Sequence, residues 1–133
     1  MTGETSLPAL LKSLSPVLNE GDYVFCSIAS HEDLRGLEPQ GSFREREGLT
    51  VILRCEHAEQ LNLNVDYVAT WITLNVHSAL SAVGLTAAFA AALSRAGISC
   101  NVVAGYYHDH LFVAKDDGPR AIVVLQQLAS AAE

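Results

Sequence analysis

The turn at residues 83–86, Val-Gly-Leu-Thr, is the first candidate for chemistry in this sequence, because it contains a glycine and precedes a helical pattern. The first N–H groups of a helix have no partner within the helix, and the helix dipole favours negative charge beside them. A carboxylate can therefore bind to the backbone of this turn. Gly84 permits a close approach, and the Thr86 hydroxyl offers one further donor. In the structural alternative, Gly84 only allows close packing of helix and strand, and Thr86 is an ordinary first-turn residue.

The second candidate is a group of histidines. His108 and His110 flank Asp109, and His77 could join them to bind a metal ion or to transfer protons. Neighbouring residues of a strand or tight turn point in different directions, however, and a His-x-His pair at a turn is not a typical zinc spacing. We therefore interpret Asp109 as a turn residue. We predict no bound metal, and a small metalloprotein centred on these histidines is the least favoured alternative.

Motifs typical of catalytic sites are absent from the sequence. It contains no nucleophile elbow and no glycine loop of the phosphate-binding kind. His77 and Ser78 are neighbours in a predicted strand, so their side chains point to opposite faces and cannot form a nucleophile–base pair. We predict that the protein is not an enzyme and that it uses no cofactor.

The turn at residues 83–86 is predicted to join a strand to a helix. Residues 71–77 alternate bulky apolar with polar side chains, which is typical of a strand with one buried face. Apolar residues then recur with the spacing of a helix that packs on a sheet, at Leu85, Ala88, Phe89, Ala92, Leu93 and Ala96. Gly97 is a natural C-terminal cap for this helix.

Two further strands and a helix follow in the predicted order. The strands are expected at residues 100–107 and 111–114, and the helix at residues 118–129. The order strand, helix, strand, strand, helix predicts a ferredoxin-like α+β unit, an antiparallel sheet with helices on one face. Such a unit needs a fourth strand, which we expect to come from residues 23–29 or from a partner chain.

The first half of the chain has a less regular pattern. We predict short helices at residues 7–14 and 56–61, strands at residues 23–29 and 49–55, and a polar loop at residues 31–48. Both the first strand of this half and the strand at 71–77 start with an aromatic residue and continue with apolar residues. We therefore predict a tandem arrangement of two halves.

The pattern of the second half resembles the ACT domain, a regulatory module that binds small molecules. The resemblance rests on residues 83–85 opening a helix, residues 93–99 ending it, and Asp109 before the strand at residues 111–113. It covers residues 69–129 and is similar to the tandem ACT repeats of aspartokinases and to small bacterial stand-alone proteins with two ACT-like halves. The resemblance implies a degenerate ACT-like half at residues 1–66 and a fuller ACT-like half at residues 67–133.

In ACT domains, the effector usually binds to the loop before the helix and to the strand after it. The resemblance therefore implies a ligand site at Ser78, Val83, Gly84, Leu85, Thr86, Cys100, Asn101 and Val102. In tandem ACT proteins the ligand lies between two facing units, so Glu47 could meet the α-amino group of an amino acid whose carboxylate binds at Gly84. The alternative is that Glu47 is a solvated charge.

The resemblance implies a non-catalytic regulatory protein that binds a small molecule, most often an amino acid in this family. Binding would act allosterically, through contacts in a homodimer or with a regulated enzyme. The main alternative is an assembly module without a ligand, in which the sheet edge left by the missing fourth strand pairs with another chain.

Composition restricts the partners and the location of the protein. The net charge is −7 and the basic residues are scattered, so we expect no nucleic-acid partner. The N-terminus has no signal-peptide pattern and no run is long enough to span a membrane, so we predict a cytoplasmic protein. Cys26, Cys55 and Cys100 each lie in an apolar run, which indicates buried thiols rather than disulfides.

Overall fold

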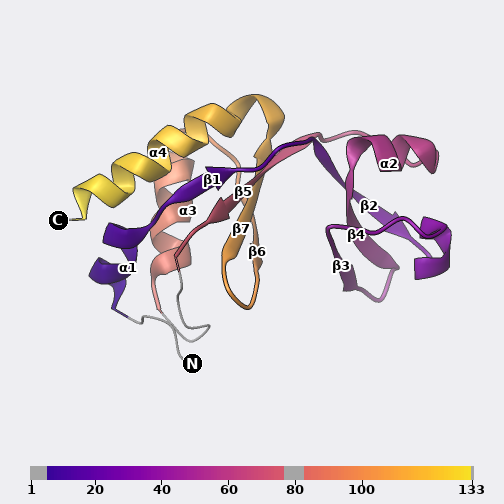
Figure 1. The fold of residues 1–133 in the computed structure, drawn as a ribbon, viewed down its shortest axis with the longest axis horizontal. Helices are drawn as coiled ribbons and strands as arrows, with labels where there is room; N and C mark the ends of the chain where they lie inside the picture. Colours follow the sequence, from indigo (N-terminus) through magenta and orange to yellow (C-terminus); the bar gives the residue numbers. More distant parts are fainter. Residues whose placement is uncertain (1–5, 77–82, 133) are drawn as a thin grey trace. The chain divides into compact units, whose positions relative to one another are not determined.

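A computed structural model describes residues 6–76 and 83–132 of the protein. The chain forms two compact units, which are shown in Figure 1. Unit 1 combines Met1–Glu20 with Thr70–Glu133, and unit 2 is Gly21–Ala69. The predicted residues His77 and Ser78 lie outside the described part of the chain.

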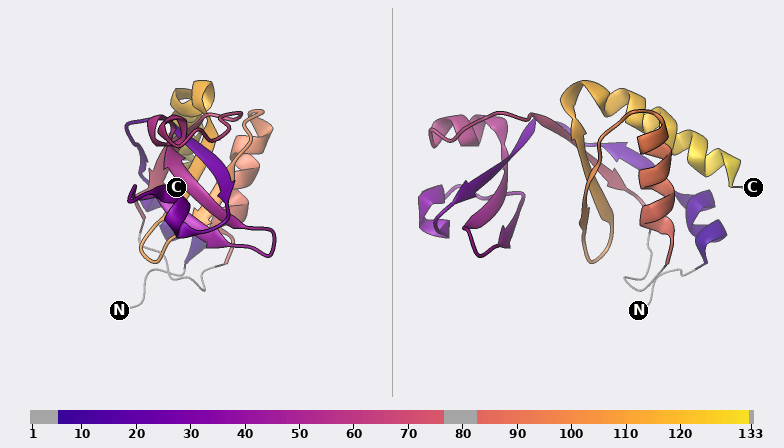
Figure 2. Two further views of the ribbon diagram at one scale, coloured as in Figure 1. Left: turned by 90° about the vertical axis from the view of Figure 1, so that its right-hand side faces the viewer. Right: turned by 180° about the vertical axis from the view of Figure 1, so that it is seen from behind.

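Unit 1 is built on an antiparallel sheet with helices on one face. The strand order is β1-β5-β7-β6, with β1 at Pro16–Leu18, β5 at Ala69–Leu74, β6 at Asn101–Ala104 and β7 at Asp109–Ala114. The helices are α1 at Leu7–Ser13, α3 at Leu85–Arg95 and α4 at Gly118–Ala131, with the short 3-10 turn η2 at Lys115–Asp117 before α4. Figure 2 shows α3 and α4 side by side from behind. The predicted ferredoxin-like α+β fold is confirmed.

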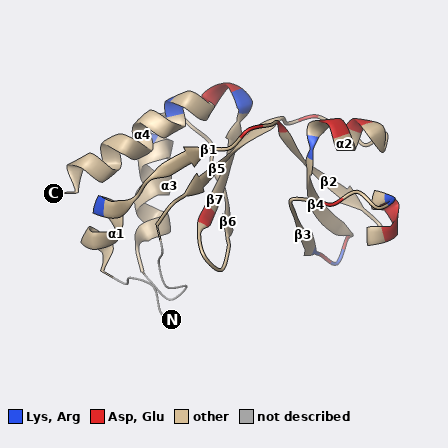
Figure 3. Cartoon of the chain, in the orientation of Figure 1, with Lys and Arg blue, Asp and Glu red and all other residues tan. Residues whose placement is uncertain are grey.

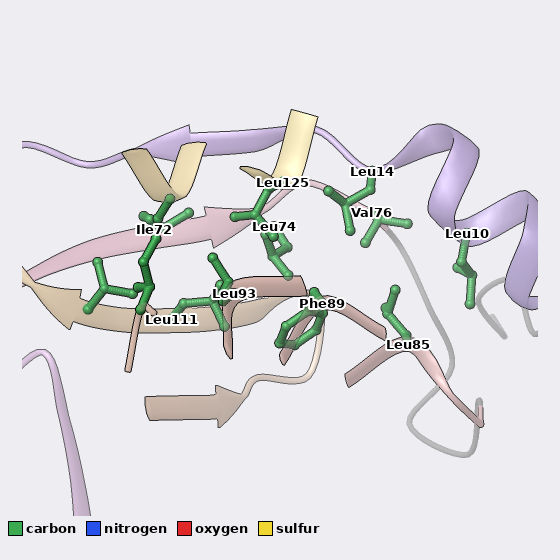
Figure 4. Packing of buried hydrophobic residues seen from close by; sticks show 13 residues of the cluster. Leu10, Leu14, Ile72, Leu74, Val76, Leu85, Phe89, Leu93, Leu111 and Leu125 are labelled. Carbon is green, nitrogen blue, oxygen red and sulfur yellow. The ribbon is translucent and has the colours of Figure 1, made fainter. Parts of the chain in front are cut away.

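The core of unit 1 lies between this sheet and its helices. On β5 and β7, alternate residues point inward, and Ile72, Leu74 and Leu111 are completely buried. They pack with Phe89 of α3 and Leu125 of α4, as Figure 4 shows. The period of two along the strands and the helical spacing along α3 thus bury their apolar faces against each other. The helix ends as predicted, with Gly97 in a left-handed conformation at φ 77°.

The fourth strand of unit 1 is β1, and the prediction that residues 23–29 supply it is wrong. Pro16, Val17 and Leu18 pair with Leu74, Thr73 and Ile72 of β5. The strand at residues 23–29 exists as β2, but its only pair with β5 is Tyr23 with Ala69. The sequence did not predict β1, because its three residues are too few to show an alternation of apolar and polar side chains, and because Pro16 is typical of the end of a helix. A proline is tolerated in a strand at a sheet edge, because its missing N–H is not needed there.

The N-terminal helix α1 packs in unit 1, whereas the sequence grouped it with the first half at residues 1–66. Its Leu10 is fully buried and Leu14 is 5% exposed, both in the same core cluster as Phe89 and Leu125. The helix contacts α3 and α4. Its apolar face is covered in this way because α3 and α4 present apolar side chains, which a local sequence pattern does not reveal.

Unit 2 is a smaller sheet with one helix. The strand order is β3-β4-β2, with β2 at Tyr23–Ile28, β3 at Gly41–Arg44 and β4 at Leu49–Arg54, and the helix α2 spans Cys55–Gln60. Its core consists of Val24, Cys26, Ile28, Leu34, Leu49, Val51, Leu53 and Ala58. The predicted strands and the predicted short helix of this half are present.

The predicted polar loop at residues 31–48 contains more structure than its pattern indicates. A 3-10 turn, η1 at His31–Leu34, starts with Ser30, whose side chain accepts a hydrogen bond from Glu32 N. The strand β3 pairs with β4 from Gly41 to Arg44. Three of the four residues of β3 are exposed and none is fully buried, so the strand has no apolar alternation. The pairing with β4 therefore forms it, rather than burial of a face.

We expect Leu10→Ala to destabilise the protein by about 2–5 kcal/mol, because it leaves a cavity in the core of unit 1. The matched control is Leu18→Ala at a side chain that is 46% exposed, for which we expect less than about 1 kcal/mol. Urea unfolding measures both values. Equal effects of the two substitutions would contradict the placement of α1 in this core.

Candidate ligand site

The start of α3 is the best-formed part of the predicted site. Gly84 is the N-cap residue, with φ 98° and ψ −16°, and no described side chain caps the helix. The first intrahelical bond runs from Ala88 N to Gly84 O. The N–H groups of the first turn, from Leu85 to Ala87, therefore have no helical partner, and no acidic side chain lies in this turn. The geometry suits an anion.

Both the backbone conformation at position 84 and the neighbouring side chains favour a glycine there. Its φ of 98° lies in the left-handed region that other residues adopt only with strain. A Cβ added at Gly84 would lie 3.0 Å from Leu7 Cδ2, so α1 covers one side of this turn. This contact with Leu7 was not predicted from the sequence, since the two residues are far apart in the chain. A substitution at Gly84 would thus test folding together with binding.

The side chains of the turn differ in their access to a ligand. Leu85 is 3% exposed and belongs to the core, so it can offer only its backbone N–H. Val83 is 82% exposed. Thr86 is exposed in the first turn of the helix. Among the described residues of the turn, Thr86 is therefore the one whose polar side chain can contact a bound molecule directly.

Cys100, Asn101 and Val102 lie at the other end of α3. They follow its C-terminus, whereas Gly84 precedes its first residue, and a helix of 11 residues is roughly 16 Å long. Figure 1 shows the tip of the β6–β7 hairpin, which follows Ala104, at the same end of unit 1 as the start of α3. The end of β6 at Ala104 is thus nearer to the start of α3 than the end at Asn101 is.

These three residues also have restricted chemistry. Burial raises the pKa of the Cys100 thiol to about 11, so it stays protonated at neutral pH. The Asn101 Nδ2 donates a hydrogen bond to Phe112 O at 3.3 Å, within the β6–β7 ladder. Val102 is 36% exposed and offers an apolar surface.

Glu47 belongs to unit 2, in the exposed turn between β3 and β4. Its role towards an amino group stays a prediction. The similar letters Gly48-Leu49-Thr50 and Gly84-Leu85-Thr86 have different geometry. Gly84 has a positive φ at a helix start, whereas Gly48 does not and precedes a strand.

The histidine cluster is organised by a hydrogen-bond network that the sequence did not reveal. Trp71 Nε1 donates to His110 Nδ1 at 3.1 Å. Asn19 Nδ2 donates to Thr73 Oγ1 at 2.9 Å, and that hydroxyl lies 3.2 Å from the same His110 nitrogen. Because an indole N–H can only donate, His110 Nδ1 is the acceptor and the ring proton sits on Nε2. The network therefore holds His110 in its neutral form.

The surroundings of the β6–β7 hairpin shift the pKa values of His110 and Asp109. Burial lowers the pKa of His110, with His108 adding to the effect and Asp109 opposing it. Burial also raises the pKa of the Asp109 carboxyl, with His110 opposing it. His108 Nδ1 is buried and has no hydrogen-bond partner among the described residues. In residues 6–76 and 83–132, no group of three or more His, Cys, Asp or Glu side chains is arranged to hold a metal ion.

We expect acid to destabilise the folded protein through His110. Its pKa is lower in the folded protein than the ordinary value near 6.5, so the unfolded chain binds the proton first as the pH falls. The stabilisation is complete above about pH 7 and is lost as the pH falls from there through the folded pKa.

The variant that tests this is His110→Asn, whose side-chain oxygen can still accept from Trp71 but cannot titrate. Between about pH 7.5 and pH 5, the free energy of unfolding should fall less steeply in the variant than in the unchanged protein. Urea unfolding at several pH values gives both slopes. Parallel slopes would show that His110 is not the group responsible.

Comparison with known proteins assigns the chain to a family. Residues 2–70 match one model of the ACT domain, and residues 67–127 match a second. No curated protein sequence matches the chain. A crystal structure of a Vibrio cholerae protein of unknown function, described as a possible transport protein, is 51% identical. It covers 94% of this chain and 97% of its own, with a TM-score of 0.86.

More distant structures share the fold. A protein from Agrobacterium tumefaciens is 18% identical over 87% of this chain and 89% of its own, with a TM-score of 0.67. The ligand-free regulatory subunit of aspartate kinase from Thermus thermophilus is 10% identical over 87% of this chain and 96% of its own, with a TM-score of 0.66. Two family matches in tandem, together with this fold, confirm the resemblance: the chain belongs to the ACT domain family.

Proposed function

We propose that the protein is a regulatory sensor that binds an amino acid at the start of α3. The observation that carries the proposal is the uncapped first turn after Gly84, in a chain of the ACT domain family. The ligand carboxylate accepts hydrogen bonds from the backbone N–H groups of this turn, and the Thr86 hydroxyl adds a donor. Binding shifts the equilibrium between two arrangements of subunits or partners, so that no catalytic step is required.

A cytoplasmic location belongs to the same proposal. In the described part of the chain, Cys26, Cys55 and Cys100 form no disulfide, which fits a reducing compartment. No helix in the described part of the chain is long and apolar enough to cross a membrane.

We expect one amino acid, or a small group of similar ones, to raise the melting temperature of the protein. A ligand at 100 times its Kd that binds only the folded state stabilises it by about 2.7 kcal/mol, which corresponds to several degrees. Thermal unfolding against the twenty amino acids measures the shift. Thr86→Glu should abolish it, because the new carboxylate occupies and repels the anion position. The variant should still fold, since an acidic residue is favourable in the first turn of a helix.

The matched control is Thr86→Gln, which has a similar size and no charge. It should bind more weakly than the unchanged protein but better than Thr86→Glu. An equal rise of the melting temperature with ligand in both variants would show that the ligand does not bind at the start of α3. A flat response to all twenty amino acids would contradict amino-acid binding.

A second candidate function, assembly through a sheet edge, is favoured by the exposure of β6. This strand is at the end of the strand order, and all four of its residues are exposed. Figure 3 shows it without charged residues. The other two edge strands carry features that discourage pairing: β1 is three residues long and contains Pro16, and β3 ends at Arg44 and is followed by the charged residues Glu45, Arg46 and Glu47. Of these three edge strands in the described part of the chain, β6 is therefore the best suited to pairing, whereas the sequence predicted the edge left by a missing fourth strand.

The register of β6 defines how a second copy would pair with it. Gly105 N donates to His108 O, so the hydrogen-bonded pairs of the ladder are Val103 with His110 and Asn101 with Phe112. The N–H and C=O groups of Val102 and Ala104 therefore point away from β7. We propose an antiparallel β6–β6 contact centred on Val103, which brings no like charges together.

Ala104→Pro should prevent this dimer without disturbing the hairpin. The Ala104 N–H is not used in the ladder with β7, and a proline is tolerated at a sheet edge. Analytical ultracentrifugation should detect a dimer of the unchanged protein and of the control Ala104→Val, and a monomer of Ala104→Pro. A monomer at every concentration of the unchanged protein would exclude the contact.

A further inference from the structure

Unit 2 contains a cavity of about 220 Å³ that the proposed function does not use. It lies beside β2, where residues 63–67 pass the edge opposite β4. β2 pairs with β4 along its whole length but with β5 only at Tyr23 and Ala69. On this strand, the cavity is lined by Phe25, Cys26 and Ser27, which follow Tyr23 along β2. Its lining residues all belong to unit 2, whereas the start of α3 belongs to unit 1.

Asp66 is the only charged residue among the described residues that line this cavity. Its Oδ2 accepts a hydrogen bond from Asn64 Nδ2 at 3.0 Å, which orients the carboxylate. Among the described residues, no Lys, Arg or His forms an ion pair with it. Cys26 Sγ donates a hydrogen bond to Asn64 O at 3.7 Å, which connects the segment that contains Asp66 to β2. A negative charge without a cationic partner favours a cation in the cavity and disfavours an anion.

Two aromatic rings also line the cavity. Phe25 is 38% exposed and Tyr67 is 40% exposed. Aromatic faces attract cations and also pack against alkyl chains. A carboxylate together with two aromatic rings is thus suited to a ligand that has a positive head and a short apolar part.

The edge of β2 supplies further hydrogen-bonding groups. Cys55 N donates to Asp22 O, which fixes the alternation of the ladder, so Val24 and Cys26 bond to β4 while the backbone groups of Ser27 point away from it. The Ser27 carbonyl is one of these outward groups, and Ser27 lines the cavity. An ammonium group has three donors and no acceptor, so a carboxylate and a carbonyl are the partners that it needs.

We propose that this cavity is a binding site for small primary ammonium compounds. Asp66 and the Ser27 carbonyl hold the ammonium group, and Phe25 and Tyr67 contact the alkyl part. The cavity is smaller than the roughly 300 Å³ at which pockets for drug-sized ligands begin, so the ligand has few heavy atoms. This site is separate from amino-acid binding at Gly84 and does not depend on it.

The probe is n-butylammonium, titrated into the ¹⁵N-labelled full-length protein and followed by two-dimensional NMR. We expect saturable shifts of the amide signals of Ser27, Asp66 and Tyr67. The neutral probe 1-butanol has the same shape and should bind much more weakly. Asp66→Asn keeps the hydrogen bond with Asn64 and removes the charge, and should weaken binding by about tenfold or more, because a hydrogen bond to a charged group is worth about 1.5–3 kcal/mol.

The matched control is Glu59→Gln, which removes one exposed negative charge from α2 of the same unit, outside the cavity lining. It should leave the affinity unchanged. Equal weakening in Asp66→Asn and Glu59→Gln would reveal only general attraction to an acidic chain and overturn the proposal. Equal binding of 1-butanol, or no shifts at tens of millimolar n-butylammonium, would also overturn it. Tyr67→Leu, which keeps the bulk and removes the ring, should weaken binding and gives a second test of the same placement.

Discussion

The burial of one face of β5 and β7 is the constraint on which the structure of unit 1 depends. Ile72, Leu74 and Leu111 have no exposed surface. A shift of one residue in either strand would turn these side chains to the opposite face, so the register is strongly fixed. The helices α3 and α4 cover this face, and α1 extends the cover with Leu10. The places of these three helices follow from this packing.

The opposite face of the same strands carries the polar and aromatic residues as a direct consequence. Trp71 and Thr73 alternate with the buried residues of β5, and both reach His110 on β7. Asn19, just after β1, joins them through Thr73. Burial on one face and hydrogen bonding on the other thus hold three strands together, and they also keep His110 neutral. The histidine that looked like a metal ligand or an acid–base group is in this way part of a structural network.

The proposed sites for a ligand or partner lie where a helix or a sheet ends. The core fixes α3 through Leu85 and Phe89, and so presents the free N–H groups of its first turn at a defined position. The sheet of unit 1 ends at β6, which leaves the backbone groups of Val102 and Ala104 unpaired within the ladder. In unit 2, β2 pairs with β5 only at Tyr23, and the cavity lies beside Phe25, Cys26 and Ser27. Backbone groups that point out of a helix end or a sheet edge thus take part in all three proposals.

The sequence alone determined β5, α3, β7 and α4, because each has a buried face whose period of 2 or 3.6 residues is visible in the chain. It also determined the family, through the residues around Gly84 and Asp109 that resemble the ACT domain. Only the tertiary structure decided that β1 is the fourth strand, that β3 exists, and that α1 packs in unit 1. It also placed Gly84 at the start of α3 and Cys100 beyond its C-terminus. The physical reason is that a three-residue strand and an exposed edge strand bury no periodic face, and that pairing between distant segments depends on which edges and faces remain uncovered once the others have packed.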